Sequence, residues 1–165
     1  MRLQTSLSLT NASAIVDESL RLGREANLLP LTVVALDAGG KLIAVKCEDG
    51  SGIMRFDVAF GKAWGALGMG ISSRLIRDRL ADRPSFQNAL AAASDGRLIP
   101  VPGGVLVRDA NGITIGAIGI SGDTSDKDEY CAIAAIHFAG LLSESVEPDQ
   151  GWRDSSLSDT YPPSK

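Results

Sequence analysis

The sequence contains a single histidine, His137, and this limits the chemistry available to the chain. Metal sites built on several histidines, and the triad of two histidines and one carboxylate, need residues that this sequence lacks. A nucleophile–histidine relay would have to use His137 alone. On the helix expected around it, His137 lies at the flank of the apolar stripe. We interpret it as a packing or subunit-interface residue, with axial haem ligation or general-base catalysis as the alternative.

Four acidic residues surround the expected start of the last helix: Asp123, Asp126, Asp128 and Glu129. Four carboxylates could hold a divalent cation. Acids also stabilise a helix N-terminus, because they meet its exposed N–H groups, and Ser125 with Asp128 resembles a capping box. We favour capping and expect no metal site. Asp128 or Glu129 would act as a general base if it is buried.

Cys131 and Lys62 are the other side chains with possible chemistry. A cysteine near the start of a helix can become a thiolate nucleophile. Cys131 also begins an apolar stripe, and a buried cysteine usually behaves as a small hydrophobe, so we favour a core role. Lys62 could pair with a bound anion or stabilise an oxyanion, but a solvated lysine is the commoner outcome and the one we favour.

Two glycine turns, Pro102-Gly103-Gly104 and Ser121-Gly122, flank the final strands. Their backbone N–H groups are unobstructed by side chains and suit a carboxylate, a phosphate or an oxyanion. Ordinary β-turn chemistry explains the same residues equally well. The sequence has neither GxGxxG nor GxxxxGK[ST], so nucleotide binding has no specific support.

The elements that must position these residues can be read from the apolar periodicity. Helices are expected over 10–27, 55–69, 72–93 (as two short helices divided near Pro84) and 125–145. Strands are expected over 31–37, 41–47, 97–101, 105–109 and 113–120. Apolar residues occupy nearly every position of the hairpin 31–47, so we expect both of its faces to be covered. The order indicates an α+β domain with about five mostly antiparallel strands and helices packed against them.

The helix over 55–69 carries two stripes. Phe56, Ala59, Phe60, Ala63 and Leu67 form the apolar one, and Gly61, Gly65 and Gly68 lie nearly opposite. Each interior glycine costs about 1 kcal/mol of helix stability relative to alanine. We therefore expect a close neighbour on the glycine side, either another helix, a subunit or a flat ligand. In the helix over 125–145 we expect a core stripe of Cys131, Ala134, Ala135, Phe138, Leu141 and Leu142.

The amino-acid composition and net charge limit which class of protein the chain can belong to. With 44% hydrophobic and 22% charged residues, the chain is an ordinary globular sequence, and we expect one domain over 1–145 and a polar tail over 146–165. In that tail Trp152, Leu157 and Tyr161 would serve as anchors. A net charge of −4 and scattered basic residues argue against nucleic acid as a partner. We expect no signal peptide, no membrane span and reduced cysteines, hence a cytoplasmic protein.

Several landmarks in order resemble one known family. They are Val34-Ala35-Leu36-Asp37-Ala38-Gly39-Gly40-Lys41-Leu42, Glu48-Asp49-Gly50, Gly61-Lys62-Ala63, Pro102-Gly103-Gly104-Val105, the run 115–122 and Asp128-Glu129-Tyr130-Cys131-Ala132. They are similar to the GlcG/HbpS-like (haem-degrading-domain, DUF336) family. The resemblance implies a profilin-like fold with a five-stranded sheet, and homo-oligomers. Family members include haem-binding sensors, domains fused to corrinoid adenosyltransferases and proteins of catabolic operons, so the family alone does not fix the chemistry.

These observations favour a small-molecule-binding protein of a catabolic or biosynthetic pathway. Its expected ligand-binding residues are Phe56, Pro102, Gly103, Gly104, Ser121, Gly122 and Cys131. The first alternative is a cofactor-free isomerase, lyase or hydrolase acting on a carbonyl or carboxylate compound. There Asp128 or Glu129 would move protons, while Lys62 stabilised an enolate or oxyanion. The second alternative is a haem-binding module, and haem is implied by the resemblance only.

Overall fold

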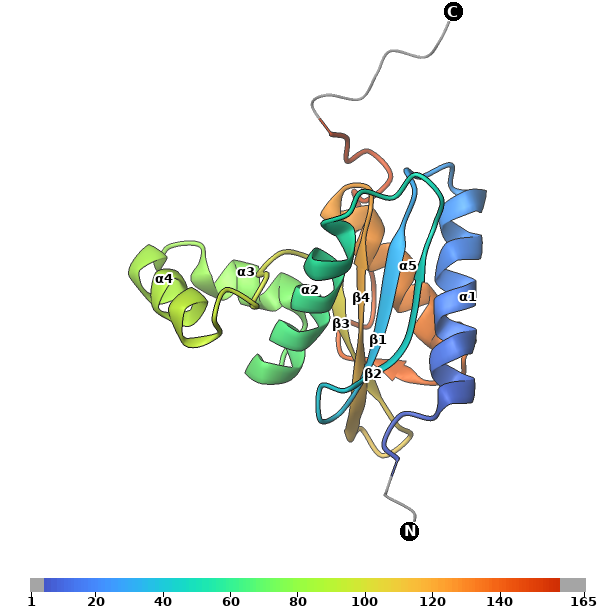
Figure 1. Cartoon of the computed structure of the whole chain (residues 1–165), viewed down its shortest axis with the longest axis horizontal. Coiled ribbons are helices and arrows are strands. Elements are labelled where there is room, and N and C mark those ends of the chain that lie inside the picture. The colour runs from blue at the N-terminus through green and yellow to red at the C-terminus, as the bar shows by residue number, and fades with distance from the viewer. Residues whose placement is uncertain (1–4, 158–165) are drawn as a thin grey trace, which may run out of the picture.

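The computed structural model describes residues 5–157, which form one antiparallel sheet with helices on both faces (Figure 1). The strands are β1 (Thr32–Asp37), β2 (Leu42–Cys47), β3 (Gly104–Arg108), β4 (Thr114–Ser121) and β5 (Leu142–Ser143). Their order across the sheet is β2-β1-β4-β3-β5. The helices are α1 (Leu9–Glu25), α2 (Arg55–Met69), α3 (Ser73–Leu80), α4 (Pro84–Ala93) and α5 (Ser125–Phe138). The predicted α+β class with a five-stranded sheet is confirmed.

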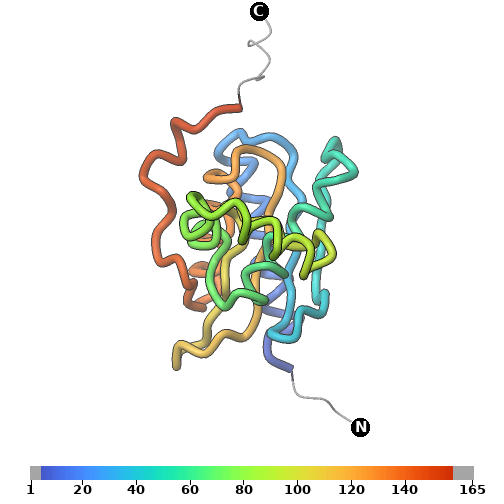
Figure 2. Tube along the Cα trace, turned by 90° about the vertical axis from the view of Figure 1, so that its left-hand side faces the viewer, coloured from blue at the N-terminus to red at the C-terminus, as the bar shows by residue number. Residues whose placement is uncertain are grey.

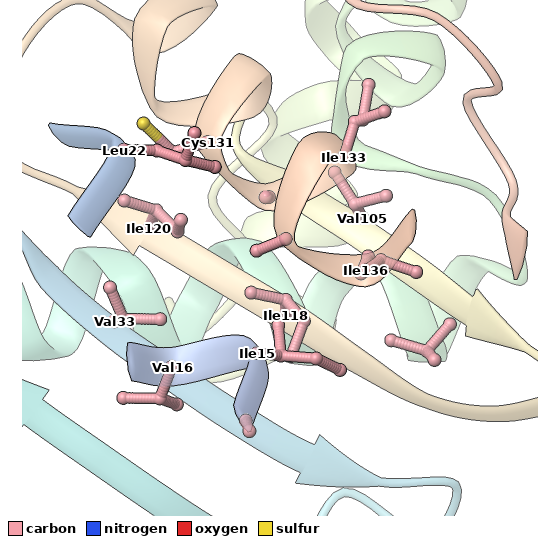
Figure 3. Packing of buried hydrophobic residues seen from close by; sticks show 14 of the residues in the cluster. Ile15, Val16, Leu22, Val33, Val105, Ile118, Ile120, Cys131, Ile133 and Ile136 are labelled. Carbon is pink, nitrogen blue, oxygen red and sulfur yellow. The ribbon is translucent and has the colours of Figure 1, made fainter. Parts of the chain in front are cut away.

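Alternation along β1 divides the core into two layers. Val33 and Ala35 belong to the apolar cluster shared with α1 and α5, whereas Val34 and Leu36 belong to the cluster under α2. Successive side chains of a strand point to opposite faces, so one buried strand supplies both layers. Figure 3 shows the larger layer, in which Ile15 of α1 and Ile136 of α5 lie over the strands.

The second face carries α2, which packs closest to β4. A Cβ on Gly119 would lie 1.9 Å from the carbonyl oxygen of Ala59, so a residue without a side chain lets the helix lie directly on the strand. Ala59 and Ala63 of the predicted apolar stripe are fully buried. Phe56 and Phe60 are only partly buried beside them.

The glycine side of α2 is occupied by the segment predicted as a strand over 97–101. That prediction is wrong, because the segment joins no sheet and packs on α2 instead. A Cβ on Gly61 would lie 2.5 Å from the carbonyl oxygen of Arg97, and one on Gly65 would lie 3.2 Å from Leu98. Two glycines are therefore covered, by a segment without regular secondary structure rather than by a helix. Gly68 has open space around it.

The last helix ends earlier than predicted, at Phe138. Gly140 has a φ of +73°, and Leu141 donates to the carbonyl oxygen of Ile136, which closes the helix with a left-handed turn. The chain then forms β5 rather than two more helical turns. Of the predicted core stripe, Phe138 and Leu142 are exposed, at 67% and 50% of their surface.

The expectation that both faces of the first hairpin are covered holds for β1 and fails for β2. Strand β1 is buried at five of its six positions, whereas most of β2 is exposed or half-exposed. The reason is topological, since β2 forms the edge of the sheet and only α1 lies beside it.

Helix α1 begins one residue before the predicted start and is capped by Ser8, and Asn27 (φ 53°) follows its end as predicted.

The remaining segments lie outside the two-layer core. The two short helices expected over 72–93 are confirmed as α3 and α4; they extend away from the sheet (Figure 1), and α4 has no buried residue. Beyond β5 the chain runs along the margin opposite to β2 (Figure 2). There Trp152 stacks on Tyr130 at 3.7 Å between ring centroids. Tyr161 lies outside the described residues. Among those described, no helix combines the length and apolarity of a membrane span.

Candidate functional site

A buried ion pair joins the two helical layers where β4 ends and β3 begins. The Lys62 ammonium of α2 lies 2.8 Å from an Asp128 carboxylate oxygen of α5, and it also donates to the carbonyl oxygen of Ile120 at 2.9 Å. The two side chains are 2% and 1% exposed. Two residues predicted to carry chemistry are thus brought together from positions far apart in the sequence.

The Pro102-Gly103-Gly104 turn closes over this pair. Gly103 has a φ of +111°, and a Cβ there would lie 2.9 Å from the Lys62 ammonium and 3.0 Å from the Asp128 side chain. A Cβ on Gly104 would lie 2.2 Å from the Lys62 carbonyl oxygen. The Gly104 N–H donates to Ser73 Oγ at 2.8 Å. The glycines are required by close packing around Lys62, and one of the turn's amides already has a protein acceptor.

Two acidic side chains at the start of α5, those of Asp123 and Asp128, accept hydrogen bonds from backbone N–H groups. Asp128 accepts from the Asp123 N–H at 3.2 Å, and Asp123 accepts from Leu29 and Thr124. The predicted capping box of Ser125 and Asp128 is not formed, because Thr124 is the N-cap and accepts from the N–H of Lys127, which has no carboxylate to complete such a box. Burial raises the pKa of Asp128, while Lys62 opposes that effect. Within residues 5–157 no group of three such side chains is arranged to hold a metal ion.

Glu129 points away from the Lys62–Asp128 pair, toward α3. Its side chain is fully buried, neither carboxylate oxygen has a hydrogen-bond partner, and Arg74 Nε lies 3.2 Å away as an ion-pair partner. Burial raises the pKa of Glu129 to about 7, and the opposing attraction of Arg74 is too weak to restore its ordinary value. Such a carboxyl group can gain or lose a proton near neutral pH.

Of the other predicted ligand-binding residues, Pro102 and Ser121 border the buried pair, whereas Cys131 and Phe56 lie elsewhere. Ser121 is buried and accepts from Arg55 at 3.2 Å, and Gly122 packs against the carbonyl oxygen of Pro30. Pro102 is buried beside the turn glycines. Cys131 lies in the core between α1 and α5, where burial raises the pKa of its thiol to about 12, so it is no thiolate near neutral pH.

Phe56 lines a cavity between the first turns of α2 and the segment 95–99. The cavity has a volume of about 470 Å³, and its lining residues are Met54, Phe56, Asp57, Val58, Phe60, Asp95, Gly96, Arg97 and Ile99. The rings of Phe56 and Phe60 lie 6.1 Å apart, and the Arg97 guanidinium lies 4.7 Å from the Trp64 ring. Phe56 was predicted as a ligand-binding residue, but its neighbours in this cavity were not predicted, because residues 97–101 were expected in the sheet. The available signal was the row of large aromatic side chains at the edge of the α2 stripe.

His137 lies on α5, across the sheet from this cavity. It is exposed, and its Nε2 lies 2.9 Å from Ser143 Oγ. Ser143 donates its hydroxyl proton to the carbonyl oxygen of Ser145, so Nε2–H is the donor to Ser143.

Fold and site together define a small α+β sheet domain with a sealed polar centre and an apolar surface cavity. The chain belongs to the haem degrading protein HbpS-like family, whose model matches residues 7–137. A crystal structure of a PduOC–haem complex is similar, with 23% identity, a TM-score of 0.74, and 82% of this chain and 96% of that chain covered.

Two further solved structures show the same fold. Protein ORFY of Klebsiella pneumoniae, of the DUF336 family, has 23% identity and a TM-score of 0.74, with 85% of this chain and 94% of that chain covered. HbpS has 22% identity and a TM-score of 0.70, with 84% and 93% covered. No curated protein matches the chain.

Proposed function

We propose that this protein binds a flat, largely apolar small molecule in the cavity beside α2. The observation that carries the proposal is the pairing of Phe56 and Phe60, two partly buried rings that line a cavity of about 470 Å³. Small-molecule sites are typically concave, mostly apolar, and supplied with a few polar groups that fix orientation. Arg97 and Asp57 are polar groups of that kind in the lining.

Haem belongs to this class of ligand, and the residues present fit it. Phe56 and Phe60 offer apolar surface to a porphyrin face, and Arg97 offers a cation to a propionate. Met54, 68% exposed, supplies the one thioether in the lining. Bound haem would supply a redox-active iron. A related structure holds haem, which supports the same class of ligand here. Because His137 lies across the sheet, haem would bind without histidine ligation, and weakly.

We further propose that the protein works in the cytoplasm as a homo-oligomer, serving a catabolic or biosynthetic pathway. Ligand binding is favoured over cofactor-free catalysis because a small molecule can reach the cavity but cannot reach the buried ion pair. Lys62 and Asp128 are sealed beneath the Gly103 turn, whereas the aromatic pair of α2 borders open space. A substrate would have to displace the turn to reach the buried pair.

The proposal is tested by mass spectrometry of the native protein for copurified ligands and by titration with haem and protoporphyrin IX. We expect Phe60→Asp to weaken binding about tenfold or more, because a charge replaces stacking surface. Phe86→Asp, which changes a phenylalanine of α4 that is not among the lining residues, is the matched control and should bind as the wild type does. Equal binding by Phe60→Asp, a Soret complex lost in His137→Ala, or no ligand in either experiment would overturn the proposal.

A further inference from the structure

Strand β2 is the open edge of the sheet. It pairs with β1 on one side, and no strand lies beyond it in the described chain. The opposite edge is different, because β5 has only two residues and residues 144–157 run along that margin (Figure 2). An edge strand presents N–H and C=O groups that can pair with another chain.

The register shows which groups of β2 are free. The Glu48 N–H donates to the Leu31 carbonyl oxygen, so Leu31 and Glu48 form a hydrogen-bonded pair. Such pairs alternate along an antiparallel ladder, and therefore Lys46 and Ala44 direct their backbone groups toward β1. Val45 and Cys47 direct theirs outward. The outward groups lie near the middle and at the end of the strand, where another strand can reach them.

The middle of this edge carries few of the devices that usually prevent pairing, because the register shift of the β1–β2 ladder lies at its Leu42 end. In Leu42–Cys47 there is no proline, and the single charged residue, Lys46, already forms an ion pair with Asp17 of α1. Val45 and Leu42 are 38% and 39% exposed. They lie on the same face of the sheet, because they oppose Val34 and Leu36, which pack under α2. Cys47 opposes Thr32, two residues before Val34, and therefore lies on that face as well. Helix α2 packs on β1, β3 and β4 and leaves this face open.

We propose that β2 pairs edge to edge with β2 of a second copy of this chain, antiparallel and with Val45 on the two-fold axis. This register places Lys46 opposite Ala44 of the other copy, so that the two lysines do not face each other. It joins the outward groups of Val45 in a hydrogen-bonded pair and extends both sheets into one. A two-fold contact uses the same surface on both copies, and an apolar strand is complementary to itself in this arrangement.

The inference rests on the proposed homo-oligomer and adds its interface. Size-exclusion chromatography with light scattering should give the wild type a multiple of the 17.2 kDa chain mass. Val45→Pro removes an outward N–H that β1 does not use, and Val45→Lys adds a charge on the axis. Both should reduce that mass to half or less. Leu142→Lys, which puts the same charge on the opposite edge, is the matched control and should leave the mass unchanged.

Hydrogen exchange separates loss of pairing from loss of folding. In Val45→Lys, peptides from residues 42–48 should exchange faster, while those from β4 keep their wild-type protection. A wild type of 17.2 kDa would refute the homo-oligomer itself. A multimer that survives Val45→Lys would refute this interface alone, and so would a Leu142→Lys variant that dissociates.

Discussion

The buried charges of this protein are held in two different ways. Lys62 and Asp128 lie 2.8 Å apart, and each has a further hydrogen bond to the backbone. Removing one partner of such a pair leaves an uncompensated charge in the interior, which is strongly destabilising. Glu129 has an ion-pair partner in Arg74 and no hydrogen bond. It is therefore a buried acid that can change its charge near neutral pH.

Glu129 predicts a pH dependence of folding stability. Its pKa is about 7 in the folded protein, against an ordinary value of 4.5. Because the folded state holds the proton more tightly, the group's contribution is fully present below pH 4.5 and is lost as the pH rises through about 7. We expect roughly 2–3 kcal/mol of unfolding free energy to disappear between pH 5 and 8 through this residue. Urea unfolding of Glu129→Gln at both pH values should show that this loss is removed.

The control for this experiment is Glu25→Gln, which makes the same substitution at a glutamate whose side chain is 66% exposed. That variant should keep the wild-type loss of stability. The same pH dependence in Glu129→Gln and the wild type would contradict the assignment.

At the scale of elements, the helices and strands that depend on a pattern within one segment could be predicted from the sequence. The contacts between segments distant in the sequence could not. The periodicity of 55–69 gives α2 with its bounds, and Pro84 marks the break between α3 and α4. The segment 97–101 is as apolar as a strand, but its place is decided by Gly61 and Gly65 of α2, which leave room for it. In the site, Lys62 and Asp128 were singled out by residue type. Their pairing depends on how the middle of α2 and the first turn of α5 are placed against the sheet, and no local sequence pattern shows that placement.

The three glycines of α2 make a graded test of this packing. A Cβ on Gly61 meets the Arg97 carbonyl oxygen at 2.5 Å, whereas one on Gly68 meets nothing within 4 Å. We expect Gly61→Ala to destabilise by about 1–3 kcal/mol, since backbone must move, and Gly68→Ala to stabilise by roughly 1 kcal/mol through helix propensity. Gly65→Ala, at 3.2 Å from a leucine side chain, should fall between them. Chemical unfolding of the three variants measures the order, and a stabilised Gly61→Ala would show that the covering segment is not held there.

At the scale of the molecule, the chain after β5 belongs to the packed domain as far as it is described. Glu144 accepts from the Ser72 N–H at 2.7 Å, and the Glu147 carbonyl oxygen accepts from Arg74, the partner of Glu129. Ser155 bonds to Thr124, the N-cap of α5. These contacts tie the segment to α3 and α5 and place it over the buried acid. The first residues of the predicted polar tail thus contact α3 and α5.

Trp152 provides the test of that conclusion. It is 7% exposed, and its ring lies nearly parallel to that of Tyr130, with Arg153 above it. Truncating it should cost about 2–4 kcal/mol, because a large buried side chain is removed from a site with little else to fill it. Trp152→Ala should therefore lower the melting temperature by roughly 5–10 °C, while Val146→Ala, at a position 65% exposed, should stay within about 1–2 °C of the wild type. If both variants melt with the wild type, the segment is an appendage and the domain ends at β5; if Trp152→Ala alone is destabilised, the domain extends at least to this residue.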